Sequence, residues 1–166
     1  MPARSDTVAL VGIATAVAVV DQLTKLFVVS RFGPGQSASR VEVADGWLAL
    51  QYTENRGAAF GLFSGLAPIL AVASIAILTA LLLHYLRQVR PSLWQTVAIG
   101  AIAGGALGNL VDRVRLGHVI DFLSVGPWPN FNVADSAITV GVLVLIWGWT
   151  RPATAFSLAR AIDQGS

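Results

Sequence analysis

The amino-acid sequence predicts an all-α membrane protein, a bundle of four transmembrane helices in a single domain over residues 1–166. Hydrophobic residues make up 55% of the chain and charged residues only 12%, whereas a soluble domain usually contains about 25% charged residues. Too little polar surface is left to cover a water-soluble globule. Four stretches are also long and apolar enough to cross a bilayer core, which takes about 20 residues.

The four predicted spans alternate with polar segments and lie at about residues 7–30, 66–86, 93–111 and 133–150. An even number of spans places both chain ends on the same side of the membrane. Lys and Arg residues are similar in number on the two sides, but Arg87 and Arg90 crowd one very short segment. By the positive-inside rule, this density favours cytoplasmic termini.

The first stretch also has the outline of a cleaved signal peptide, because Arg4 precedes an apolar run. A signal peptide, however, ends at its cleavage site. Here the apolar pattern resumes at Leu26, after the polar interruption that contains Asp21 and Lys25. We therefore interpret this stretch as a retained span.

The first segment outside the membrane, about residues 31–65, contains a predicted β-hairpin. Polarity alternates over Val41–Val43, Asp45-Gly46 is a turn signal, and residues 47–52 are rich in strand formers. Open sheet edges are not stable in hydrocarbon. The hairpin should therefore rest on the bilayer surface.

Three glycines recur at every fourth position of the third predicted span, at Gly100, Gly104 and Gly108. This spacing allows two helix backbones to approach closely in a membrane. The alternative, a phosphate-binding loop, does not suit residues inside an apolar span. We expect these glycines to form a helix-packing face.

No sequence feature predicts a metal or cofactor site. The chain has no cysteine, which excludes disulfides, a thiolate nucleophile and thiolate metal ligands. His84 and His118 are far apart, and no His-Glu-x-x-His motif occurs. Aromatic residues are not interleaved with basic runs, so nucleic acid is not an expected partner.

Acidic residues gather toward one end of the predicted bundle. Asp21 lies late in the first span, Asp112 follows the third, and Asp135 lies early in the fourth. Because successive spans run in opposite directions, all three should lie near the same membrane face. Helix caps and interfacial ion pairs are the alternative, but they would scatter over both faces. Since ionisable groups at membrane depth are expensive and mostly functional, we predict a site here.

Asp121 and Asp135 form a candidate catalytic pair. Asp121 lies in an apolar stretch, Val119–Leu123, that would desolvate its carboxylate and raise its pKa. If the two carboxyl groups meet, they cannot both ionise easily, so one keeps a proton. Such a pair can perform general acid–base catalysis on a water molecule and a peptide carbonyl, without a covalent intermediate.

Two further groups of polar residues allow two interpretations each. Asn109, Asp112 and Arg113 share a helical face if the third helix continues. Arg113 could then hold an incoming carbonyl or phosphate, or it could pair with Asp112 to close the helix end. Asn55 and Gly57 could belong to a helix N-terminal cap, or to a loop that presents the Asn55 side chain and the Gly57 backbone to a ligand.

Five motifs occur in order along the chain: Asp21–Lys25, Asn55–Gly61, Gly108–Arg113, Val119–Phe122 and Trp128–Ser136. Together they resemble those of the bacterial lipoprotein signal peptidases (signal peptidase II), and the resemblance spans nearly the whole chain. It implies a membrane-embedded aspartic endopeptidase of the bacterial cytoplasmic (inner) membrane, with its active site toward the outer face. Such enzymes remove the signal peptide from preproteins that carry a diacylglyceryl group on the lipobox cysteine.

By position, the resemblance implies that Asp121 and Asp135 are the catalytic dyad. The residues implied to bind substrate or shape the site are Asp21, Lys25, Asn55, Gly57, Asn109, Asp112, Arg113, Asn132 and Ala134. It also implies a small sheet and a short helix from the first loop, which rest on the outer leaflet. The expected partners are the lipid-modified preprotein, membrane lipids and the cyclic peptide inhibitor globomycin; no cofactor is expected.

The rival function is a small proton-coupled carrier that uses the same carboxylates as a relay. Carriers usually contain inverted repeats or broken helices near the bilayer midplane. The sequence contains neither, and its carboxylates lie toward one face. A purely structural membrane subunit would not explain the acidic cluster. We therefore expect a protease whose two aspartates meet at the lipid boundary and share one proton.

Overall fold

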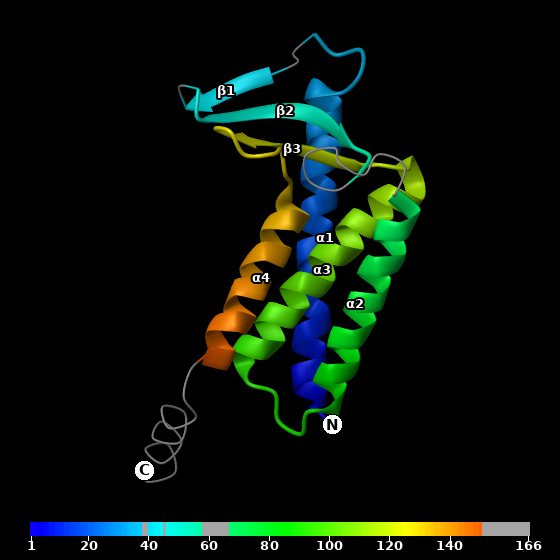
Figure 1. Ribbon diagram of the computed structural model, residues 1–166, viewed down its shortest axis with the longest axis vertical. Helices are drawn as coiled ribbons and strands as arrows, with labels where there is room; N and C mark the ends of the chain where they lie inside the picture. Colours follow the sequence, from blue (N-terminus) through cyan, green and yellow to red (C-terminus); the bar gives the residue numbers. More distant parts are fainter. Residues whose placement is uncertain (38–39, 45, 58–66, 151–166) are drawn as a thin grey trace.

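The computed structural model describes residues 1–37, 40–44, 46–57 and 67–150. Within these ranges the chain forms four helices and one three-stranded antiparallel sheet. The helices run side by side as a bundle, and the sheet lies across the end opposite the N-terminus (Figure 1). In chain order the elements are α1 (Arg4–Phe32), β1 (Arg40–Ala44), β2 (Leu48–Asn55), α2 (Ala67–Arg87), α3 (Leu93–Leu116), β3 (Val119–Val125) and α4 (Val133–Thr150).

The outer surface of the bundle is apolar. Ile69, Val114 and Leu143, from three different helices, are between 59% and 77% exposed, as expected for side chains in contact with lipid. By length and composition, α1, α3 and α4 can each cross a membrane, whereas the described apolar part of α2, Ala71–Arg87, is shorter. The chain is therefore mostly helical with several membrane spans, and a fourth span at α2 stays a prediction.

Helix α3 forms the centre of the bundle, and its glycines make this possible. A Cβ atom on Gly100 would lie 3.0 Å from the Ile13 side chain of α1, and one on Gly104 would overlap the Ala14 backbone. On another face of α3, a Cβ atom on Gly105 would lie 2.5 Å from the carbonyl oxygen of Ala134 in α4. Small residues thus let α3 contact α1 and α4 closely, as predicted for the glycine series.

The predicted hairpin is present as β1 and β2. The two strands pair antiparallel with Val41 opposite Leu50. Gly46 has a φ of 71° in the connection between them, and this left-handed conformation is readily adopted by glycine. Asp45, the other residue of the turn signal, lies outside the described residues.

The third strand corrects the expectation that the sheet comes from the first loop alone. β3 follows α3 directly and pairs antiparallel with β2, in the order β1-β2-β3. Most of its side chains are buried, because the strand lies between the hairpin and the helices (Figure 1). The expected short helix is not found in the described parts of the first loop, residues 33–37, 40–44 and 46–57; the rest of that loop lies outside them.

Candidate active site

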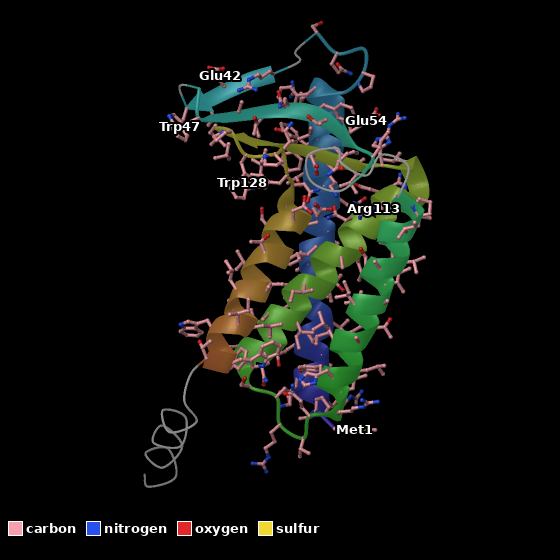
Figure 2. All side chains as sticks on the ribbon, in the orientation of Figure 1. Met1, Glu42, Trp47, Glu54, Arg113 and Trp128 are labelled. Carbon is pink, nitrogen blue, oxygen red and sulfur yellow. The ribbon has the colours of Figure 1, made fainter. Side chains whose placement is uncertain are left out.

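A cavity of about 820 Å³ lies where the sheet meets the bundle. In Figure 2, Glu54, Arg113 and Trp128 all lie at this end of the molecule. The residues around the cavity come from β2, α3, β3, α4 and the loop before α4. They are Thr53, Glu54, Asn55, Arg56, Gly57, Arg113, Asp121, Trp128, Pro129, Asn130, Phe131, Asp135, Ser136, Thr139 and Val140. Asp121 and Asp135 thus share one cavity wall.

Asp135 lies in the first turn of α4, and Asn132 fixes where that turn begins. The Asp135 backbone N–H donates to Asn132 Oδ1 at 2.9 Å, so Asn132 acts as the helix N-cap. The preceding loop is held against β3, because the N–H of Leu123 donates to the Phe131 carbonyl at 2.8 Å and that of Phe131 donates back at 3.0 Å. On its other side, the Asp135 carboxylate accepts a 2.8 Å hydrogen bond from Asn109 Nδ2.

Asp121 lies within β3, is 1% exposed, and accepts hydrogen bonds on both carboxyl oxygens. Asn55 Nδ2 donates to Oδ2 at 2.9 Å and Asn132 Nδ2 donates to Oδ1 at 2.7 Å. Each amide is oriented by a backbone N–H on its own oxygen: that of Gly57 for Asn55, at 3.1 Å, and that of Asp135 for Asn132. The two amides therefore present N–H groups, and not oxygens, to Asp121.

Burial raises the pKa of Asp121 to about 7, and the negative charge of Asp135 acts in the same direction. The hydrogen bonds from Asn55 and Asn132 oppose this rise, because they stabilise the charged carboxylate. The two acids are also linked through amides, since Asn132 Nδ2 donates to Asn109 Oδ1 at 3.1 Å. Asp121 can consequently hold a proton up to about neutral pH, and a proton shared with Asp135 stays a prediction.

Lys25 forms the centre of a buried charged cluster below the cavity. Its ammonium group lies 2.8 Å from Asp21 Oδ2 and 2.7 Å from Asp112 Oδ2, and it donates to Asn109 Oδ1 at 3.0 Å. The Lys25 side chain is only 2% exposed. Because a buried charge is tolerated only when it is paired and hydrogen-bonded, this cluster fixes α1 against α3.

Asp21 connects the same cluster to α4. Its Oδ1 accepts the backbone N–H of Ala134 at 2.9 Å, which supplies a negative charge to the helix N-terminus. Gly108 leaves the space for this carboxylate, since a Cβ atom there would lie 2.5 Å from Asp21 Oδ2. Ala134 is fully buried. Three helices thus converge on one buried acidic side chain immediately beneath the candidate dyad.

The Asp112–Arg113 pair, one of the two interpretations of these residues, is not formed. Asp112 instead binds Lys25 and accepts the backbone N–H of Ile120 at 3.1 Å. Arg113 borders the cavity, and among the described residues no carboxylate lies within 4.0 Å of its guanidinium. It is still close enough to the acidic groups of the site to interact with their charges. Its donors therefore remain available to a ligand in the cavity.

At the end of β2, the Asn55 amide donates to Asp121 and the Gly57 N–H donates to Asn55 Oδ1. The loop interpretation, in which both groups are presented to a ligand, stays a prediction. Whether the segment also caps a helix depends on residues outside the described ranges. Glu54, the residue before Asn55, contacts basic side chains instead. Its Oε2 lies 2.8 Å from Arg56 Nη2 and 4.0 Å from His118 Nδ1. Arg56 holds the pKa of Glu54 below its usual range.

The site also contains residues that were not among the predicted ones, among them Gln22, Thr53 and Asn130. Gln22 Nε2 donates to Asp112 Oδ1 at 2.9 Å and to the Gly108 carbonyl at 3.1 Å. Its place between two predicted site residues was a usable signal. Thr53 and Asn130 also border the cavity. Asn130 lies within the Trp128–Ser136 motif, which was a usable signal, whereas nothing in the sequence neighbourhood of Thr53 distinguishes it from a surface residue. Within the described ranges, no group of three or more His, Asp and Glu side chains is placed to hold a metal ion.

Residues 13–151 match the sequence family described as Signal peptidase (SPase) II. The chain belongs to this family. A lipoprotein signal peptidase of Syntrophomonas wolfei is 42% identical over 130 residues, which cover 78% of this chain and 85% of the relative. A lipoprotein signal peptidase of Parasynechococcus marenigrum is 43% identical over 139 residues, which cover 82% and 86% of the two chains.

Solved structures share the fold as well as the sequence. A structure described as a bacterial membrane enzyme, determined by the in meso method at 1.9 Å resolution, is 34% identical with a TM-score of 0.75. The match covers 86% of this chain and 92% of that one. Membership of the signal peptidase II family implies a protease, and together with the apolar helices it makes the chain a multi-pass membrane protein.

Proposed function

We propose that this chain is an aspartic endopeptidase that removes the signal peptide from diacylglyceryl-modified preproteins, with Asp121 and Asp135 as its catalytic dyad. The observation that carries the proposal is the presence of both aspartates on the wall of one cavity. Asp121 keeps a proton up to about neutral pH, with a pKa of about 7. Two carboxyl groups that share one proton are what aspartic proteases use to activate water.

In the proposed reaction, Asp135 accepts a proton from water as the water oxygen attacks the scissile carbonyl carbon. Neutral Asp121 donates its proton to the carbonyl oxygen, which gives a tetrahedral diol. When the diol collapses, Asp121 takes back a hydroxyl proton and Asp135 gives its proton to the leaving nitrogen. The C–N bond breaks, and both carboxyl groups return to their initial protonation states.

Arg113 and Asn132 would assist the dyad in different ways. Arg113 borders the cavity, and its guanidinium can orient a substrate carbonyl through a planar pair of N–H donors. Asn132 holds Asp121 and the first turn of α4 in fixed relation. The buried Lys25 cluster would support both from below. Residues 1–166 would form a single peptidase domain in which every helix except α2 contributes directly to this constellation.

The distribution of tryptophan supports an orientation in the membrane. Trp47 and Trp128 are exposed at the sheet end, and Trp94, Trp147 and Trp149 lie toward the other end of α3 and α4. Two such groups are typical of the two membrane–water interfaces. We place the sheet on the outer leaflet of a bacterial inner membrane, with four spans and cytoplasmic termini. The cavity would then meet both hydrolytic water and a lipid-anchored substrate or a globomycin-type inhibitor.

Separate Asp121→Asn and Asp135→Asn variants, assayed on a lipidated preprotein in detergent, test the dyad. Each is expected to lose at least about 1,000-fold in kcat, because neither acid nor base alone completes the reaction. Thermal unfolding checks that the variants remain folded. Asp6→Asn is the matched control, since Asp6 also lies in the first turn of a helix but at the opposite end. Wild-type turnover in either dyad variant would show that Asp121 and Asp135 are not a catalytic dyad.

A further inference from the structure

Thr53 and Asn130 form a polar pair on the cavity wall outside the candidate dyad. Asn130 Nδ2 donates to Thr53 Oγ1 at 2.7 Å, which joins β2 to the loop before α4. Among the described residues neither side chain has another hydrogen bond. The Asn130 carboxamide oxygen, its second N–H and the Thr53 hydroxyl proton therefore remain available to a ligand.

A β-bulge in β2 brings this pair beside Asp121. Leu50 is opposite Leu123, but Thr53, and not Tyr52, is opposite Asp121. The additional residue in β2 shifts the register, and bulges next to active sites commonly re-aim a side chain in this way. Opposite residues of an antiparallel pair have Cβ atoms about 4.5–5.5 Å apart. The Thr53–Asn130 pair is consequently next to the carboxyl group that would protonate the substrate.

A substrate that begins as a membrane helix requires hydrogen-bond partners for its backbone when it enters the cavity. The peptide must unwind before its scissile bond can reach the dyad, and unwinding frees backbone N–H and C=O groups. Each such group left without a partner in a membrane costs several kcal/mol. Pro129, Phe131 and Val140 on the cavity wall offer no polar side-chain group, and the Ser136 hydroxyl already donates to a backbone carbonyl. Arg113 supplies donors but no acceptor.

We propose that Asn130 is a substrate-binding residue that pairs its carboxamide with a backbone peptide group of the unwound substrate beside the scissile bond, and that Thr53 is the positioning residue that orients it. A carboxamide offers one donor and one acceptor, the complement of a peptide group. The inference rests on the proposed function, and it names a substrate contact outside the dyad.

Steady-state kinetics on a lipidated peptide test the contact. Asn130→Ala is expected to raise KM about tenfold with kcat changed less than about twofold, because a hydrogen bond made equally in ground and transition states affects binding alone. Thr53→Val should also raise KM, whereas Thr53→Ser, which keeps the hydroxyl group, should have the wild-type KM. In the Asn130→Ala background, Thr53→Val should have no further effect, since Thr53 acts through Asn130.

Substrate variants identify the partner directly. A series of lipidated peptides, each N-methylated at one backbone nitrogen near the scissile bond, removes one N–H at a time. The wild-type enzyme should discriminate against one of these peptides, and Asn130→Ala should lose that discrimination. Should Asn130→Ala fold poorly, Thr53→Val gives the same comparison. The proposal would be overturned if N-methylation at every position changed KM by the same factor in the wild-type enzyme and in Asn130→Ala. It would also be overturned if Asn130→Ala lowered kcat and left KM unchanged.

Gln51→Ala is the matched control on the same strand. It removes an exposed side-chain hydrogen bond, from Arg40 Nη1 to Gln51 Oε1 at 3.1 Å, and it should leave KM unchanged. The outcomes also separate the two proposals. If the wild-type chain does not cleave the lipidated peptide, the proposed function fails and this contact fails with it. If the dyad variants are inactive but Asn130→Ala behaves as wild type, only the contact is wrong.

Discussion

Asn132 contacts Asp121 with one end of its amide and the backbone of Asp135 with the other. Its Nδ2 donates to Asp121 Oδ1 at 2.7 Å, and its Oδ1 accepts the Asp135 N–H at 2.9 Å. Asn132 is fully buried, so neither contact is exchanged with water. A single side chain therefore determines how a carboxyl group on a strand lies relative to one on a helix.

Asn132→Asp separates this positioning from helix capping. Asp caps helices about as well as Asn, so the α4 N-cap is kept, but the additional buried carboxylate should lower the thermal stability. The N–H donor to Asp121, however, is replaced by a charged oxygen, which opposes the release of the Asp121 proton to the substrate, and we expect kcat to fall at least about 100-fold. Asn132→Ala should lose activity and also about 1 kcal/mol of capping energy. Ser92→Ala at the α3 N-cap is the control for stability loss alone.

The activity should depend on pH as a bell-shaped curve. Asp121 has a pKa of about 7 in the free protein, so raising the pH above this value removes the shared proton and activity declines. At low pH both carboxyl groups are protonated, and no base remains to activate water. Measurements of kcat/KM report these ionisations in the free enzyme. A flat profile from about pH 4 to about pH 9 contradicts the single-proton pair.

Asn55→Ala should move the alkaline side of that profile to higher pH. The Asn55 hydrogen bond lowers the pKa of Asp121, so its removal raises the pKa and the proton is retained longer. We expect a shift of about one pH unit, from the usual strength of a hydrogen bond to a charged group. Gln51→Ala on the same strand should leave the profile unchanged. A shift to lower pH in Asn55→Ala would show that Asn55 does not donate to the carboxylate.

The helices and the hairpin could be predicted because their signals are local. A bilayer-length apolar run needs no tertiary information, and neither does the Asp45-Gly46 turn with its flanking alternation. β3 is different. Its near-continuous apolar run, Val119–Val125, is compatible with a buried strand or with a helix segment. Only its pairing with β2 decides between them, and this pairing is a long-range contact.

The site residues likewise include some that local signals predict and others that depend on long-range contacts. The gathering of acidic residues at one end followed from span directions, but the partner of Asp112 depends on how α1 is rotated against α3. The sequence could nevertheless have excluded Arg113 as that partner, since adjacent helical residues do not face each other. Lys25 is the partner instead. Thr53 could not have been identified, because a bulge in β2 places it opposite Asp121.

Gly108→Ala should disrupt the site through one methyl group. The new Cβ atom would lie 2.5 Å from Asp21 Oδ2, and Asp21 cannot move without losing Lys25 and the N-terminus of α4. We expect a loss of about 1–3 kcal/mol in the free energy of unfolding, typical of overpacking, together with reduced cleavage. Gly12→Ala is the matched control, because nothing lies within 4 Å of a Cβ atom there. Equal stability of the two variants would mean that α1 and α3 are not packed this closely.

Lys25→Met should strongly lower the stability of the protein, although Lys25 does not border the cavity. Removing the ammonium group leaves Asp21 and Asp112 buried beside each other without a counter-charge. Breaking a buried ion pair from one side typically costs about 3–5 kcal/mol, which unfolding in sodium dodecyl sulfate can measure. A Lys25→Met/Asp112→Asn double variant should recover part of this loss, since it removes one uncompensated charge. If the double variant is as unstable as the sum of the single ones, the cluster is not held by charge pairing, and α1 must be fixed against α3 by apolar packing alone.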